Sequence, residues 1–420
     1  MDEIKPVDRD FFTDFKLDKC TECGECLIHC PIIDYTLEEA KEEISNLINN
    51  RPTKKLLRDC QSCFTCNFYC PYDAHPTNLI LQRWNEQYNR EGLKIRGKYY
   101  MTLHPNYPNF RTYAMDRMTG EEKQILKQWK SEEPLKTDTL TYPGCNVILT
   151  PTLTQTSLFK GLDIRGRLEY CCGETLFRTG YKDKLKQVAA RLDKWFNKLK
   201  PKKLLVLCTA GTNVFKNVLP NYGLTYEFEE IQSYLQWLWD KFEKNEINIT
   251  HPLNKKVTIQ DSCYSKMFGD EYMEIPRKIL ERIGCEVVEM KYNKVDMRCC
   301  GIAAGFSVDA AYNALKIQSA AADNLDMAKK TDADILCVYC SGCHQTITTS
   351  KKLYFKPFKM EIYHIIELIQ LAIGEIPKRL IGRTAKKMFW GNILNALPKI
   401  PKKKTFKIPP ISEDPAEEGY

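Results

Sequence analysis

The sequence predicts a multidomain fold in which a small helical, cysteine-rich domain precedes two repeated α/β units. Eight cysteines lie between Cys20 and Cys70, and the other eleven lie between Cys145 and Cys343. Near residue 138 the pattern changes, because short apolar runs begin to alternate with helical segments. A chain of 420 residues has room for several domains. The expected boundaries are 1–100 for the cysteine-rich domain, 101–137 for a linker, 138–250 and 251–375 for the two α/β units, and 376–420 for a basic C-terminal extension.

Cysteine is over-represented, at 19 of 420 residues. The first residues, MDEIKPVDRDFF, contain no cationic segment followed by an apolar one, so we expect no secretory signal and a reducing, cytoplasmic location. Thiols stay reduced in such a compartment, where a dense set of them is more typical of metal binding than of disulfides. The sequence therefore predicts metal-bound thiolates.

The first two parts of the chain differ in their expected elements. Residues 35–50 and 75–89 have apolar side chains at helical spacing, which predicts a helix between the two cysteine-rich loops and another after them. Residues 101–137 are rich in Pro, Asn, Tyr and charge, which is typical of a linker.

Four short apolar runs in the α/β part each end in cysteine. Three runs end at Cys145, Cys208 and Cys263, and the fourth carries both Cys337 and Cys340. Each run resembles a buried strand of a parallel sheet. Open α/β sheets bind ligands outside the carboxyl ends of their strands, so these thiols are expected at a binding edge.

The second α/β unit repeats the first. Cys263 follows Cys145 by 118 residues, the two Cys-Cys-Gly motifs are 128 apart, and Cys337 follows Cys208 by 129. Such similar offsets predict two copies of one unit. Residues 309–330 have helical periodicity and predict a long helix within the second copy.

The first domain carries the pattern Cys-x2-Cys-x2-Cys-x3-Cys-Pro twice, beginning at Cys20 and at Cys60. This run binds [4Fe–4S] clusters in two-cluster bacterial ferredoxins, where the fourth cysteine of each run ligates the other cluster. It predicts a ferredoxin-like domain with two cubane clusters that transfers electrons. The expected ligands are Cys20, Cys23, Cys26 and Cys70 for one cluster, and Cys60, Cys63, Cys66 and Cys30 for the other. Structural zinc is the alternative, because Cys-x2-Cys also begins zinc ribbons.

A different pattern marks the α/β units. The second unit contains Cys263, then Cys299, Cys300 and Gly301, then Cys337, Cys340 and Cys343. The first unit contains Cys145, then Cys171, Cys172 and Gly173, then Cys208, with Gly211 where a further cysteine would stand. Neighbouring thiolates can bind the irons of one cluster, and glycine is expected to let the backbone approach it. The alternatives are zinc, redox dithiols, structural cysteines and, for the first unit, a repeat without a cluster.

The segments CQSCFTCNFYCPYDAHPTNLI, CCGIAAGF, CSGCH and HIIELIQLAIG resemble the heterodisulfide reductase family, in which a ferredoxin-type relay is fused to a catalytic subunit with CCG domains. The resemblance extends to about residue 375. It implies a noncubane [4Fe–4S] cluster at which a disulfide is reduced or thiols are oxidised. The implied catalytic ligands are Cys263, Cys299, Cys300, Cys340 and Cys343. The family spacing favours Cys337 with Cys340, whereas the local sequence favours Cys340 with Cys343; we prefer the latter pair, which leaves Cys337 as a strand-end thiol or an extra ligand.

The resemblance also implies partners. A flavoprotein or cytochrome subunit would exchange electrons with the chain, and a small thiol or disulfide, or a thiol-carrying protein, would be the substrate. The sequence has no GxGxxG after a predicted strand and no Walker loop, so no flavin or nucleotide of its own is expected.

The architecture is similar as well to the iron–sulfur subunits of anaerobic glycerol-3-phosphate dehydrogenase and glycolate oxidase. This similarity implies an alternative function, a non-catalytic subunit that passes electrons from a flavin dehydrogenase of glycerol 3-phosphate, glycolate or lactate to quinone. The first unit favours it, because Gly211 leaves that unit one thiol short.

Composition excludes other classes. No window approaches 18 consecutive apolar residues, so the chain is not expected to span a membrane. The formal charge of +8 would be offset by anionic clusters, and no nucleic-acid-binding motif is present, so nucleic acid is not an expected partner. The basic extension is expected to be solvated and partly disordered, or else a docking arm for a partner or an anionic membrane surface.

Overall fold

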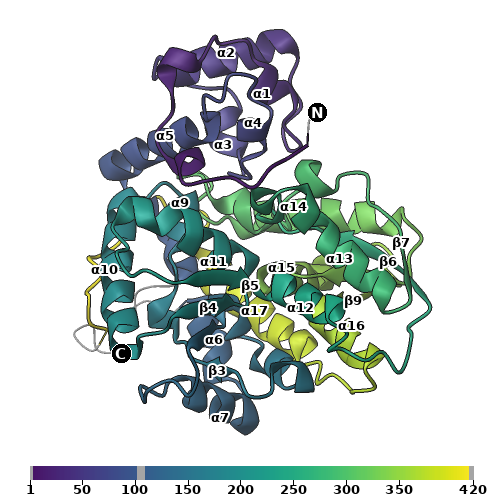
Figure 1. Cartoon of the computed structure of the whole chain (residues 1–420). Helices are drawn as coiled ribbons and strands as arrows, with labels where there is room; N and C mark the ends of the chain where they lie inside the picture. Colours follow the sequence, from purple (N-terminus) through teal and green to yellow (C-terminus); the bar gives the residue numbers. More distant parts are fainter. Residues whose placement is uncertain (1–2, 102–108, 416–420) are drawn as a thin grey trace.

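The computed structural model describes residues 3–101 and 109–415. The helices of the N-terminal domain surround its two cysteine-rich loops and form the layer drawn above the sheets in Figure 1. These helices are α1 (Glu25–Ile28), α2 (Leu37–Ile48), α3 (Leu56–Asp59), α4 (Thr65–Phe68) and α5 (Pro76–Glu91). The two predicted helices of this domain are α2 and α5. A capping box between Thr36 and Glu39 begins α2, and the indole of the buried Trp84 on α5 donates to the carbonyl of Leu57 at 2.9 Å.

Each α/β unit contains a four-stranded parallel sheet, as predicted. The first has the strand order β3-β2-β4-β5 and the second β7-β6-β8-β9, so the same topology occurs twice and the predicted repeat is confirmed. The strands are β2 (Thr139–Tyr142), β3 (Asp163–Ile164), β4 (Lys203–Val206), β5 (Glu230–Ser233), β6 (Lys255–Gln260), β7 (Cys285–Val287), β8 (Ile335–Val338) and β9 (Glu361–His364). The four strands predicted from cysteine-terminated runs are β2, β4, β6 and β8, the central pair of each sheet. Each central pair is a topological switch point, where open α/β sheets place their ligands.

Helices cover both sheets, and a single apolar core runs from the N-terminal domain through both units. The helices of the first unit are α8 (Gly144–Val147), α9 (Glu174–Arg178), α10 (Lys182–Leu199), α11 (Thr209–Asn213) and α12 (Tyr234–Glu243). Those of the second are α13 (Asp270–Arg282), α14 (Ala314–Lys329), α15 (Ser341–Ser350) and α16 (Ile365–Ala372). The helix predicted over 309–330 is therefore α14, which begins later than expected because Asn313 caps it by accepting from the N–H of Leu315.

Two segments differ from expectation because each contains structure that packs against the units. The segment expected to be a linker contains α6 (Phe110–Asp116) and α7 (Gly120–Trp129), and the expected solvated extension contains α17 (Ile381–Asn395). Helix α17 packs against α15 and α6, and a short strand after it, β10 (Thr405–Phe406), pairs antiparallel with β1 (Leu93–Lys94). Residues 102–108 of the linker and 416–420 of the extension lie outside the described residues.

One buried ion pair holds the loop that follows β6. Arg277 on α13 donates to both carboxylate oxygens of Asp261, at 2.9 and 2.8 Å, and the Tyr339 hydroxyl donates to the same carboxylate at 2.8 Å. We expect Arg277→Met to lower the free energy of unfolding by about 3–5 kcal/mol, because it leaves a buried carboxylate without its cation. Urea unfolding followed by circular dichroism measures this. Arg282→Met, on the exposed side of the same helix, is the control and should change it by less than about 0.5 kcal/mol; equal losses in both would contradict the prediction.

None of the helices in the described ranges combines the length and the apolar character needed to cross a lipid bilayer.

Candidate functional site

The eight N-terminal cysteines line two neighbouring pockets, in the two groups that the ferredoxin pattern predicts. The pockets have volumes of about 300 Å³ and 380 Å³. Cys20, Cys23, Cys26 and Cys70 line the first, and Cys30, Cys60, Cys63 and Cys66 line the second. The fourth cysteine of each run therefore lies with the first three of the other run. The thiols of Cys26 and Cys66 are close enough to interact, so the two groups adjoin.

The spacing of the sulfurs fits a cluster of several irons better than one zinc ion. In the described parts of the chain, no three cysteine sulfurs lie within 4.8 Å of one another. A tetrahedral zinc site with Zn–S bonds of 2.3 Å needs its sulfurs about 3.8 Å apart. Burial raises the pKa of the Cys26 and Cys60 thiols well above the usual value, so a bound metal is needed to hold them as thiolates.

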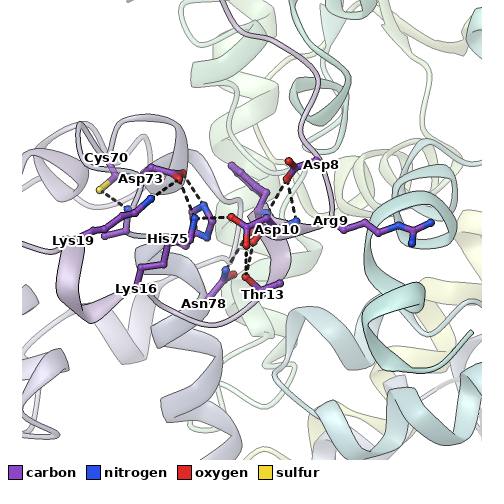
Figure 2. A network of polar contacts seen from close by, with 12 residues as sticks. Asp8, Arg9, Asp10, Thr13, Lys16, Lys19, Cys70, Asp73, His75 and Asn78 are labelled. Atoms are coloured by element: carbon purple, nitrogen blue, oxygen red, sulfur yellow. Dashed lines mark hydrogen bonds and ion pairs between the residues drawn. The ribbon is translucent and has the colours of Figure 1, made fainter.

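A polar network beside the first pocket holds the start of the chain against the loop that follows Cys70 (Figure 2). The Lys16 ammonium contacts the carboxylates of Asp10 and Asp73 at 2.6 and 3.0 Å, and the His75 ring lies 2.7 Å from Asp73. Lys16 occupies the space between these carboxylates, and its hydrogen bond lowers the pKa of Asp10. The network therefore holds the loop, in which the N–H of Ala74 donates to the Cys70 sulfur at 3.3 Å.

Five thiols of the second α/β unit gather at the switch point of its sheet. Cys263 follows β6, and Cys340 and Cys343 follow β8 at the start of α15. The pKa of the Cys300 thiol is held well below its usual value, because the thiols of Cys299 and Cys343 lie within hydrogen-bonding distance. Contact with Cys343 lowers the pKa of Cys340 in the same way. The same contacts raise the pKa values of Cys299 and Cys343, so the thiols of this group share their protons and lie close enough to bind one metal centre.

Cys337 does not join this group. It lies inside β8, fully buried, in register with Ile259 and Tyr363. Cys285 is the thiol that interacts with it, and burial is the main cause that raises the pKa of Cys337. The strand ends at Val338, so only the cysteines beyond that residue reach the carboxyl edge. The expectation that Cys337 is a metal ligand is thus not supported by its position.

The four thiols of the first unit also lie together, because all four interact with the buried side chain of Tyr142. These thiols belong to Cys145, Cys171, Cys172 and Cys208. Cys208 also faces Cys340 of the second unit, so the two cysteine groups adjoin. The structure corrects the expected repeat offset at this point. Cys208 lies two residues after β4 and Cys340 two residues after β8, so Cys340, not Cys337, is its counterpart and Gly211 stands in the place of Cys343.

The two Cys-Cys-Gly glycines lie directly against helices. A side chain at Gly301 would lie 2.7 Å from the carbonyl of Ile317 on α14, and one at Gly173 would lie 3.1 Å from Leu185 on α10. Both glycines have positive φ, of 109° and 77°. They therefore let the cysteine turn of each unit lie directly against a helix.

Three charged side chains lie near the thiols, two from α9 and one from the turn after Cys263. Arg178 on α9 donates to the Cys263 sulfur at 3.1 Å. The carboxylate of Glu174 interacts with thiols of both units, and the buried Lys266 interacts with Cys63 and Cys263. Each follows a cysteine closely in the sequence, Glu174 directly after Gly173, Arg178 five residues after it and Lys266 three residues after Cys263, but their direction toward the thiols depends on tertiary structure.

An apolar pocket adjoins the second cysteine group, between α14, α15 and α17. Leu315 and Met388 are among its lining residues. Two other lining residues contact the Cys300 sulfur: the backbone N–H of Ile302 and the hydroxyl of Thr346 lie within hydrogen-bonding distance of it. An apolar molecule in this pocket would lie one residue away from that sulfur.

The cysteine-rich CCG domain family matches the chain at residues 155–216 and 257–348, one match in each α/β unit. A component of the dihydromethanophenazine:CoB–CoM heterodisulfide reductase of Methanosarcina barkeri is 26% identical over 416 residues, covering 86% of this chain and 94% of that protein. The EtfAB:quinone oxidoreductase of Syntrophomonas wolfei is 22% identical and covers 69% of this chain. A Bacillus subtilis protein named "Probable iron-sulfur-binding oxidoreductase FadF" is also 22% identical and covers 78%. The chain spans about half the length of these last two relatives, 48% of each.

The fold, the thiol groups and these matches relate the chain to iron–sulfur oxidoreductases that transfer electrons, with a region similar to the CCG domain in each α/β unit. Within that class it is related to the heterodisulfide reductase component found in Methanosarcina, so the resemblance seen in the sequence motifs is confirmed. Several of its relatives are components of oxidoreductases with more than one subunit.

Proposed function

We propose that the chain is the iron–sulfur subunit of a heterodisulfide-reductase-like complex, in which electrons reach the second CCG unit and cleave a disulfide or, in reverse, oxidise two thiols. The observation that carries this proposal is the gathering of five thiols at the switch point of the second sheet, beyond the four that an ordinary [4Fe–4S] cluster uses. They belong to Cys263, Cys299, Cys300, Cys340 and Cys343.

The cysteine groups would hold the clusters, which supply one-electron transfer and a binding position for a substrate sulfur. The two N-terminal groups each suit a cubane [4Fe–4S] cluster and form the relay. The first CCG unit, with four thiols, suits an ordinary cluster at most, because Gly211 removes the counterpart of Cys343. A flavoprotein or cytochrome subunit is the proposed partner of the relay, and the basic residues around α17 are a proposed contact for it or for a membrane surface.

Disulfide cleavage consumes two electrons and two protons and releases two thiols, so the site needs a proton carrier as well as electrons. Glu174 is suited to this role. Its carboxylate interacts with the thiols of Cys145, Cys208 and Cys263, so it lies among the thiols of both CCG units. Its side chain is 20% exposed, so the carboxylate connects the thiols with solvent and can relay a proton from solvent to the leaving sulfur.

The apolar pocket beside Cys300 favours a second candidate function, transfer of electrons to a lipid-soluble acceptor such as quinone. In that case the chain would be the non-catalytic electron-transfer subunit of a flavin-dependent dehydrogenase. The two functions differ in what the second CCG unit binds: a substrate sulfur at the metal in one, an apolar ring beside it in the other.

Metal analysis with electron paramagnetic resonance tests the proposed function. We expect anaerobically purified protein to contain iron and acid-labile sulfide in equal amounts, and added thiol to change the spectrum of one cluster, because a substrate sulfur binds there. Cubane-like signals that no thiol perturbs would favour the electron-carrier function instead. Zinc without sulfide would contradict both functions.

A further inference from the structure

Two buried cations lie between the relay and the second CCG unit. Arg178 is the first, with a side chain only 3% exposed. Its Nη2 donates to the carbonyl of Gln61 at 2.7 Å and its Nε donates to the Ser62 hydroxyl at 3.2 Å. Gln61 and Ser62 lie between Cys60 and Cys63 in the relay. Nη1 of Arg178 also donates to the Cys263 sulfur at 3.1 Å. One guanidinium therefore contacts a thiol of the second CCG unit and the loop between two relay cysteines.

Lys266 makes a second connection between the same two groups. Its side chain is fully buried, and its Nζ donates to the Thr65 hydroxyl at 2.6 Å and to the carbonyl of Val295 at 2.7 Å. The Thr65 hydroxyl in turn accepts from the Cys63 thiol at 3.3 Å. Among the described residues, the carboxylate that acts on Lys266 is that of Asp296, through an electrostatic interaction without a direct salt bridge. A buried ammonium needs a compensating anion, and anionic clusters on its two sides would provide it.

The first CCG unit does not share these connections. Arg178 belongs to that unit through α9, yet its guanidinium is directed to the Cys263 sulfur of the second unit and to the relay loop. Its ion pair with Glu174, at 3.5 Å, keeps part of its charge balanced within the protein. The arrangement is therefore specific for one of the two units.

We propose that Arg178 and Lys266 are positioning residues that couple the Cys30/Cys60/Cys63/Cys66 group to the second CCG unit, so that electrons from the relay enter that unit. This inference rests on the proposed function. It adds which relay cluster passes electrons to the second CCG unit, and which side chains set the reduction potentials of the two clusters. Reduction adds negative charge to a cluster, so a nearby buried cation stabilises the reduced form and raises its reduction potential. Both cations lie between the two clusters, so each stabilises the reduced form on either side of the electron-transfer step.

Redox titration of the holoprotein, followed by electron paramagnetic resonance, tests the inference without any disulfide substrate. We expect Arg178→Gln and Lys266→Met each to shift the midpoint potentials of the second CCG cluster and of the adjoining relay cluster to lower values. The potential of the cluster at Cys20, Cys23, Cys26 and Cys70 should stay unchanged. Arg178→Lys keeps the positive charge, so the two midpoint potentials should stay close to those of the unaltered protein. A purely structural role of Arg178 would not predict this result.

Arg96→Gln is the matched control. Arg96 is also a buried arginine, but its guanidinium donates to the carbonyls of Ala310, Asp309 and Ile400, away from the thiols. It should leave all potentials unchanged. Unaltered potentials in Arg178→Gln and Lys266→Met with full iron content would overturn the inference, and so would an equal shift in Arg96→Gln. If Arg178→Gln loses iron, the midpoint potentials of Lys266→Met and Arg178→Lys test the inference in its place. If the potentials shift in the variants but the unaltered protein shows no disulfide turnover, the proposed function is rejected and this inference is supported.

Discussion

Replacing Cys300 with Ser is expected to abolish disulfide turnover while the N-terminal clusters remain reducible. Cys300 contacts the thiols of both Cys299 and Cys343, so it lies at the centre of the five-thiol group. Altering residues around metal ligands alone changes activity by 10–100-fold, so loss of a central ligand should lower turnover by at least about 100-fold. Turnover with a reduced viologen dye, and dithionite reduction followed by electron paramagnetic resonance, measure the two parts of this expectation.

Cys337→Ala is the control for that substitution. Cys337 is also a buried thiol of the same sheet, but it lies inside β8 and interacts with Cys285. We expect turnover and iron content to stay unchanged. Full turnover in Cys300→Ser, or its loss in Cys337→Ala, would show that the ligands of the second unit are assigned wrongly.

Replacing Cys60 with Ala is expected to remove one relay cluster, about four iron atoms per chain. The other three thiols of its group would remain, but burial raises the pKa of Cys30 and of Cys66, and three ligands leave one iron open. Electrons would then no longer reach the second unit from the partner, and turnover supported by that partner should fall at least about 100-fold.

Iron content is the direct measurement for Cys60→Ala, and Cys285→Ala is its control, because Cys285 lies in β7 away from both relay pockets. A viologen dye small enough to reduce the second unit directly should restore turnover in Cys60→Ala. If iron content is the same in both variants, Cys60 does not hold metal.

Patterns that are local in the chain predicted much of the fold and site. The two runs beginning at Cys20 and Cys60 fix which thiols face each other, because a loop with two-residue spacing can only wrap one centre. The structure accordingly groups those cysteines in two pockets. The apolar runs before Cys145 and Cys263 likewise mark central strands, because parallel strands buried on both faces are continuously apolar.

Other features depend on where an element ends or what packs against it. The choice between Cys337 and Cys343 depends on whether β8 ends before or after Cys337, and a run of Ile, Leu, Cys and Val does not mark that boundary. The many lysines of the extension at 376–420 predict a solvated segment. However, Ile381, Ala385 and Met388 form a buried stripe at helical spacing on α17. Arg178 follows the first Cys-Cys-Gly motif in the sequence, but its contacts with Cys263 and Gln61 arise only from tertiary structure.

The pairing of β1 with β10 has a mechanical consequence. After β10 the chain continues across the molecule, where the N–H of Ile408 donates to the Tyr88 hydroxyl at 2.7 Å and the N–H of Ile411 donates to Gln187 on α10 at 2.9 Å. The end of the chain thus straps the N-terminal domain to the first α/β unit. These contacts limit the motion of the N-terminal domain relative to the first α/β unit. The distance that an electron must cross between the relay and the α/β units therefore stays constant as the molecule fluctuates. Dividing this chain into separate relay and catalytic polypeptides would remove a restraint that a new interface between them would have to replace.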